Sequence, residues 1–351
     1  MSDTAIGWAD EVLNPTRGCS AVSPGCGRCY AQAVAGSPFT GLSKPGRPYH
    51  DLVEIRADGQ PRWTGKVVLD PSKLQNMLRR RPYRICADCG AKSPIGTDWY
   101  SCPWHAGAAD GSTRWRRPRI FVNSMSDLFH EALTDEQIAA VYGVMAACPW
   151  ADFLILTKRA ERLPAWYRWL GRPRVTDGDG EVRVALACLY AIGVQWERHI
   201  AYPAWPLPNC WLGVSVEDQQ RCTRIIDLLR VPAAVHWCSF EPLLEDVDPS
   251  DIQAQVPGGG IDYVDAVSRD PDEPLDPQLS DGAKLAWAVV GGESGSGHRT
   301  CPDGAIERLT RKLDEAGVPV FVKQDSGSRA GKQGRIPDEI WAYKQFPEVR
   351  P

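Results

Sequence analysis

Short, nearly continuous apolar runs recur along the chain and predict strands that are covered on both faces. Between several of these runs, the apolar positions change to a helical spacing. Strands that alternate with helices favour parallel pairing, because each helix returns the chain to the same edge of the sheet. The seven predicted strands are residues 11–14, 119–123, 153–157, 211–216, 235–240, 287–291 and 318–323.

Three predicted helices have recognisable ends or faces. Thr134 and Gln137 form a capping box that begins one helix. Asp303 is expected to cap another helix, which ends at Gly317. A third apolar face follows the fourth strand and contains Cys222, Ile225, Ile226 and Leu229.

This alternation predicts an α/β fold, a complete or partial (β/α) TIM-like barrel with its chemistry at the carboxyl ends of the strands. A doubly wound open sheet is the alternative topology. The chain divides into a first βα unit at 1–79, an insertion at 80–118 and the rest of the barrel at 119–351. Irregular insertions at about 171–208 and 249–282 interrupt that last part.

The composition excludes some classes of protein and leaves others open. The 351 residues are 43% apolar, so a large core can form. The formal charge of −4 gives no overall attraction to nucleic acid, although a local basic patch remains compatible with it. No run of about 18 apolar residues and no secretory signal is found, so we expect a cytoplasmic protein without a membrane partner. In a reducing compartment, its 12 cysteines are expected to be metal ligands or buried residues.

Three of these cysteines lie in one loop directly after the first predicted strand. Cys19, Cys26 and Cys29 have the spacing C-x6-C-x2-C among several Gly and Pro residues. A [4Fe–4S] cluster normally takes four cysteines, so a cluster held by three leaves one iron open to another ligand. The alternative is a zinc site completed by a distant His, Cys or Asp.

Further motifs accompany this loop along nearly the whole chain, at residues 121–130, 156–159, 211–217, 239–242 and 291–294. With them the chain resembles the phage-encoded three-Cys-motif protein family, which is mostly of unknown function and radical-SAM-like. The resemblance implies a radical SAM fold, a [4Fe–4S] cluster on the three cysteines and S-adenosylmethionine (SAM) as its ligand. It also implies an electron donor such as flavodoxin or ferredoxin and a neighbour-encoded partner protein. The first two cysteines are separated by six residues, whereas the best-known radical SAM pattern has three.

Polar residues at the strand ends are the candidates for the SAM-binding and substrate-binding parts of such an enzyme's active site. By the resemblance, SAM is expected to contact Tyr30, Ser124, Ser126, Asp127, Ser215 and Glu217. The substrate is expected to face Lys158, Arg159, Glu241 and Lys323. Taken singly, each residue has a simpler interpretation as a helix cap, a turn or a solvated charge.

A second group of metal-ligand residues lies in the insertion at 80–118. Cys86, Cys89, Cys102 and His105 have a zinc-ribbon-like spacing, which predicts a structural Zn²⁺ site. Arginines and tryptophans flank this group, a combination that suits phosphate contact and base stacking, although a solvated basic face is equally consistent with it.

The sequence therefore predicts a radical SAM-type enzyme that modifies or repairs a substrate, with nucleic acid or a nucleotide preferred. The first alternative is a non-enzymatic, zinc-bearing nucleic-acid-binding protein. The second is a cluster-containing protein that transfers a methyl or aminocarboxypropyl group from SAM without hydrogen abstraction.

Overall fold

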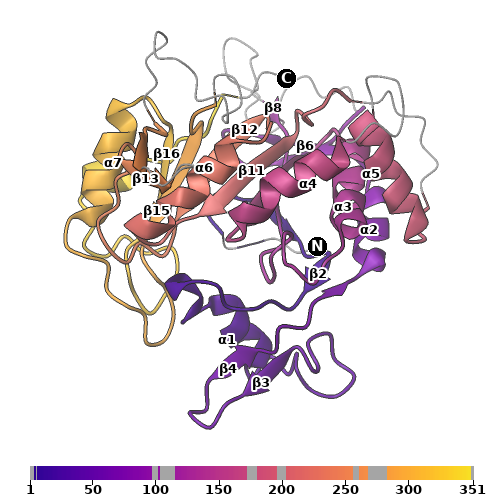
Figure 1. The fold of residues 1–351 in the computed structure, drawn as a ribbon, viewed down its shortest axis with the longest axis horizontal. Coiled ribbons are helices and arrows are strands. Elements are labelled where there is room, and N and C mark those ends of the chain that lie inside the picture. The colour runs from indigo at the N-terminus through magenta and orange to yellow at the C-terminus, as the bar shows by residue number, and fades with distance from the viewer. Residues whose placement is uncertain are drawn as a thin grey trace.

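The computed structural model describes residues 4, 6–96, 102, 115–171, 180–195, 203–255, 261–267 and 283–348. Its centre is a curled half-barrel sheet of seven parallel strands (Figure 1). In spatial order these are β1 (Glu11–Leu13), β9 (Arg119–Val122), β10 (Asp152–Thr157), β11 (Cys210–Ser215), β12 (Val235–Phe240), β15 (Trp287–Gly291) and β16 (Val320–Gln324).

All seven predicted strands are confirmed, and their order in space follows their order in the chain. The doubly wound alternative is therefore wrong, because that topology reverses the strand order at its centre. Within the described residues, no strand pairing joins β1 to β16, so the sheet is open at this side. The mixed α/β class is confirmed, whereas the radical SAM type of barrel stays a prediction.

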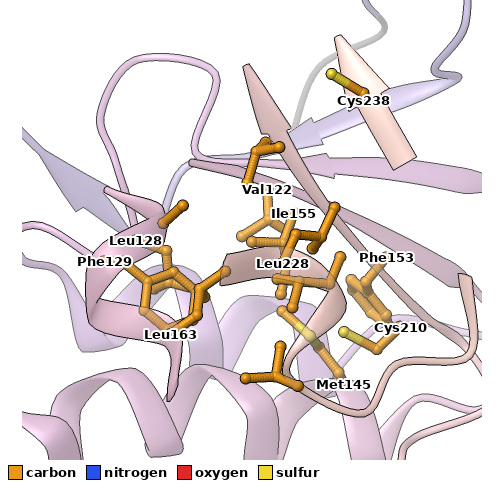
Figure 2. Close-up of a cluster of buried hydrophobic side chains, with 14 of the residues drawn as sticks. Val122, Leu128, Phe129, Met145, Phe153, Ile155, Leu163, Cys210, Leu228 and Cys238 are labelled. Carbon is orange, nitrogen blue, oxygen red and sulfur yellow. The ribbon is translucent and has the colours of Figure 1, made fainter. Parts of the chain in front are cut away.

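Helices pack on the outer face of the sheet, as the apolar spacing predicts. Thr134 and Gln137 form the expected capping box at the start of α3. Figure 2 shows part of the outer core, a cluster in which Val122, Phe153 and Ile155 of the strands are joined by Met145 of α3. In the described residues, the α-helices are α1 (Tyr30–Gly36), which packs on a separate hairpin, α2 (Pro71–Leu78), α3 (Asp135–Ala147), α4 (Leu163–Leu170), α5 (Gly180–Ala191), α6 (Thr223–Leu229), α7 (Ala305–Glu315) and α8 (Asp338–Trp341).

Aromatic side chains fill the inner face of the sheet toward the amino ends of the strands. Successive residues of a strand point to opposite faces, so one side chain in two enters this inner core. Trp8 packs edge-on against Phe121 and Trp237, with ring centroids 4.7 and 5.3 Å apart. Phe346, near the carboxyl end of the chain, stacks on Trp287 at 5.5 Å. This packing fills the inner space at the amino ends of the strands and leaves the polar carboxyl ends to form a site.

Two expectations need correction. Asp303 does not cap α7, because Gly304 is the cap residue, with φ +71°, and the Asp303 carboxylate instead pairs with Arg335 at 2.6 Å. The irregular segment at 171–208 contains α5, which packs closely on α3, since a side chain at Gly143 would come within 2.6 Å of the Ala185 carbonyl. The many apolar residues of α5 give it no clear amphipathic stripe in the sequence.

The predicted loop at 249–282 contains a hairpin of β13 (Ile252–Gln255) and β14 (Ile261–Val264). Of the described helices, none is both long and apolar enough to cross a bilayer.

Two excursions between β1 and β9 lie at opposite ends of the molecule (Figure 1). One contains α1 and the hairpin of β3 (Val53–Ile55) and β4 (Pro61–Trp63). The other is the insertion, in which β6 (Tyr83–Cys86) pairs with β7 (Lys92–Pro94) and β8 (Trp115–Arg116). A short pair, β2 (Thr16–Arg17) and β5 (Val68–Leu69), brings the chain back from the first excursion toward the sheet.

Candidate functional site

A pocket of about 240 Å³ lies at the carboxyl ends of the parallel strands. Trp8, Phe121 and Leu156 belong to its lining and connect it to the apolar interior. Most of the residues that the sequence predicts for a site converge here, although they come from five different strand ends and from the cysteine loop. They are Cys19, Cys26, Cys29, Tyr30, Ser124, Ser126, Asp127, Lys158, Arg159, Ser215, Glu241 and Lys323.

Local backbone geometry places the three cysteines at the edge of this pocket. Gly18 has φ +88°, and a Cβ there would lie 2.1 Å from the Lys66 carbonyl oxygen, so only glycine fits at this position. Cys26 ends a short 3-10 turn, and Cys29 is the cap residue of α1. As whole residues, all three cysteines are partly exposed.

Burial controls the protonation of two of these thiols. Burial raises the pKa of Cys19 to about 12, a rise that Asp127 reinforces and Arg159 opposes. Burial also raises the pKa of the Cys29 thiol, while the backbone N–H groups of Ala31 and Gln32 act in the opposite direction. At neutral pH, thiols in this setting are protonated unless a cationic centre stabilises their negative charge.

Asp127 joins the strand ends of β9 and β10 behind the cysteine loop. Its carboxylate accepts hydrogen bonds from the Thr157 hydroxyl at 2.7 Å and from the Lys158 backbone N–H at 3.0 Å. It also pairs with Arg159 at 3.1 Å. The guanidinium of Arg159 in turn lies 3.7 Å from the Cys19 sulfur and contacts Ser20, which connects this network to the loop.

Glu217 lies behind the pocket rather than in its lining. Its fully buried carboxylate pairs with Lys158 at 3.1 Å and Arg224 at 2.9 Å, and it accepts the backbone N–H of Gly25 at 3.2 Å. Burial raises the pKa of this carboxyl, but the two cations outweigh burial and lower the pKa to about 2. These contacts make Glu217 an anchor of the cysteine loop, and the predicted contact with SAM stays a prediction.

Charged side chains elsewhere on the pocket wall also have partners on other strands. Lys323 of β16 lies 2.9 Å from Glu241, which follows β12. Lys158 also donates to the Ser215 hydroxyl at 2.6 Å. The wall therefore presents paired charges of both signs, an arrangement that suits a zwitterionic ligand better than a polyanion.

Two features are missing from the residues selected by sequence: Asn123, which lines the pocket, and Arg299, which pairs with the lining residue Glu293. Asn123 follows β9 with φ +63°, is 3% exposed, and its Oδ1 finds no hydrogen-bond partner in the described part of the chain. Arg299 pairs with Glu293 at 2.6 Å and donates to the Pro24 carbonyl at 3.0 Å, so it holds the cysteine loop from another side. The place of Asn123 after a strand is a usable sequence signal, whereas Arg299 has none.

The insertion contains the second cysteine group. The sulfurs of Cys86, Cys89 and Cys102 lie within 4.8 Å of one another, so they could bind a metal ion whose identity is open. The Cys89 and Cys102 sulfurs are 3.6 Å apart, near the roughly 3.8 Å expected between two thiolates on one zinc. His105 lies outside the described residues. Within those residues, Cys19, Cys26 and Cys29 do not form a group this compact.

Contacts of the insertion place it at the amino ends of the strands, opposite the pocket. Glu11, the first residue of β1, contacts Arg80, Tyr83 and Lys92. Arg116 pairs with Asp10 at 2.6 Å, just ahead of the same strand. Much of the basic flank noted in the sequence therefore docks the insertion onto the sheet.

Comparison with known proteins gives a family and no function. A family model described as "Protein of unknown function (DUF5131)" matches residues 3–340. No curated protein matches the chain, and neither does any solved structure. Because the family model covers nearly the whole chain, the protein belongs to the DUF5131 family, whose function is unknown.

Proposed function

We propose that this protein is a radical SAM-type enzyme whose pocket holds a [4Fe–4S] cluster on Cys19, Cys26 and Cys29. The observation that carries the proposal is the convergence of three partly exposed cysteines on a pocket at the carboxyl ends of parallel strands. Fold alone does not establish a reaction, so the residues of this site carry the argument.

The donor set fits such a cluster. Three thiols are present, and they do not form the compact group that a single zinc ion requires. The loop that bears them is anchored from two sides, by Glu217 at Gly25 and by Arg299 at Pro24. When bound, the cluster and SAM supply one-electron reductive cleavage of the sulfonium bond, with the protein controlling orientation and access of water.

The chain's own residues would orient the ligand and keep water out. The unpartnered Oδ1 of Asn123 would accept a hydrogen bond from an amino group of the ligand. The Lys323–Glu241 pair would contact the polar part of a substrate. Trp8 and Phe121 would form an apolar boundary that excludes water from the reacting atoms.

The insertion is proposed to hold a structural zinc ion on Cys86, Cys89 and Cys102, with His105 as the fourth ligand. The close contact of the three described sulfurs supports this assignment. A small segment of this kind gains much of its folding free energy from the metal.

The test is to purify the protein without oxygen and to measure iron, sulfide, zinc and the visible spectrum. We expect about four irons and a broad band near 400 nm, typical of a thiolate-held iron–sulfur cluster, and their loss in Cys26→Ala. Cys188→Ala is the matched control, because Cys188 is buried in α5 away from the pocket.

Two zinc ions and no iron after reconstitution would overturn the enzyme proposal and leave a zinc-bearing binding protein. If the cluster is present, the products of SAM identify the chemistry. We expect 5'-deoxyadenosine, whereas S-adenosylhomocysteine or methylthioadenosine would indicate group transfer.

A further inference from the structure

We propose that residues 28–66, here called the pocket lobe, are the docking surface for a single-stranded nucleic acid. The entry of a nucleotide into the pocket rests on the proposed function, whereas docking on the lobe does not. The lobe contains α1 and the β3–β4 hairpin, and Figure 1 shows it projecting from the body of the molecule.

The pocket lobe adjoins the pocket and contributes residues to its lining. Tyr30 and Trp63 both line the pocket. The backbone N–H of Trp63 donates to the Gln32 side chain at 3.0 Å, which ties β4 to α1. Tyr49 and Leu52 form a small core beneath this surface. A polymer lying on the lobe would therefore pass directly beside the pocket.

The charge of the lobe is opposite to that of the whole chain. Residues 28–66 contain six Lys or Arg against three Asp or Glu, in a chain with net charge −4. Glu54 and Asp58 are matched by Arg56 and Arg62, at 3.4 and 3.8 Å.

Lys44, Arg47 and Lys66 are exposed and have no carboxylate within 4 Å in the described part of the chain. Unpaired, exposed cations of this kind are what a phosphate backbone contacts.

The pocket lobe also carries an exposed aromatic ring. Phe39 follows α1 and is 99% exposed, the highest value among the large apolar side chains of the described residues. A fully exposed phenyl ring has no packing role within its own chain. Exposed rings interleaved with cations bind single-stranded nucleic acid, because bases stack on the rings while phosphates meet the charges.

The single strand is preferred over a duplex because the pocket is recessed at the strand ends. A base inside a duplex is stacked and paired, and enzymes reach such a base only after it is unstacked. The insertion is a weaker candidate for this role. Its arginines Arg80 and Arg116 pair with Glu11 and Asp10, at the amino ends of the strands and away from the pocket.

The test measures binding of a fluorescein-labelled oligo(dT) 20-mer to the full-length protein by anisotropy, at two salt concentrations. The lobe variant Lys44→Glu/Arg47→Glu should lose about tenfold or more in affinity and show a weaker salt dependence. The matched control is Arg79→Glu/Arg81→Glu, which reverses two exposed charges on the flank of the insertion. The control should bind as the wild type does.

Phe39→Ala separates nucleic-acid binding from general attraction to polyanions. We expect about a tenfold loss for oligo(dT), because base stacking is removed, and unchanged binding of heparin. No binding by the wild type, or an equal loss in lobe and control variants, would overturn the proposal. Iron content is measured in parallel on every sample, so that failure of the cluster proposal is distinguished from failure of docking.

Discussion

Two groups of cysteines lie between β1 and β9, one at each end of the parallel sheet. At the carboxyl ends, Cys19, Cys26 and Cys29 are partly exposed and open onto a pocket. At the amino ends, Cys86 and Cys102 are buried, and the three sulfurs of the insertion approach one another. Residues that converge on a cavity can bind a reacting molecule, whereas residues that converge on one another hold a segment together.

Several of the cations near the two groups also differ in whether they are paired within the fold. Beside the insertion, Arg80 and Arg116 pair with carboxylates of the sheet. On the pocket lobe, Lys44 and Arg47 remain exposed and unpaired within the described residues. The number of basic residues in a segment is thus a poor guide to polyanion binding, because paired cations are already used within the fold.

Removing a cysteine of the insertion is the strongest test of whether the two cysteine groups have separate roles. In Cys86→Ser, we expect complete loss of the proposed zinc from the insertion and loss of its folded structure, because a bound metal would supply much of the folding free energy of so small a segment. The iron proposed for the pocket cysteines should be unchanged. Metal analysis and hydrogen exchange measure the two effects separately, and loss of both metals together would show that the two ends are not independent.

A smaller effect is expected at the anchor of the cysteine loop. Glu217→Gln leaves the partly buried Lys158 and the buried Arg224 beside each other without their carboxylate, which should cost about 3–4 kcal/mol in the free energy of unfolding. Urea denaturation and iron content are the measurements, and iron retention should fall. The control Glu245→Gln changes an exposed carboxylate near Gln219 and should cost less than about 1 kcal/mol.

The smallest effect concerns Glu11, which docks the insertion. Burial raises the pKa of Glu11, but Arg80, Tyr83 and Lys92 outweigh burial and lower the pKa to about 2. The folded-state pKa is below the unfolded value, so this carboxylate stabilises the fold above about pH 4.5. That stabilisation is lost as the pH falls toward 2.

Glu11→Gln should therefore reduce the free energy of unfolding by about 2–3 kcal/mol at pH 7 and by less than about 1 kcal/mol near pH 2.5. Urea denaturation at the two pH values measures this difference. Glu54→Gln, on the exposed lobe, should show no such pH dependence, and a pH-independent loss in Glu11→Gln would contradict the assignment.

The sequence determined the seven strands, the capping box at Thr134 and the convergence of polar strand ends, because each is set by local spacing. Nearly continuous apolar runs specify strands covered on both faces, and parallel strands place their carboxyl ends along one edge. Most of the predicted site residues therefore do line one pocket.

The tertiary structure alone decided which end of the sheet the insertion and its cysteines occupy and which charges remain unpaired. Glu217 meets Gly25 across 192 residues, and Arg299 meets Pro24 across 275. The left-handed backbone of Asn123 and the α3–α5 contact at Gly143 also depend on packing between distant segments. Such contacts arise from the curvature of the sheet and the routes of its excursions, which local spacing does not encode.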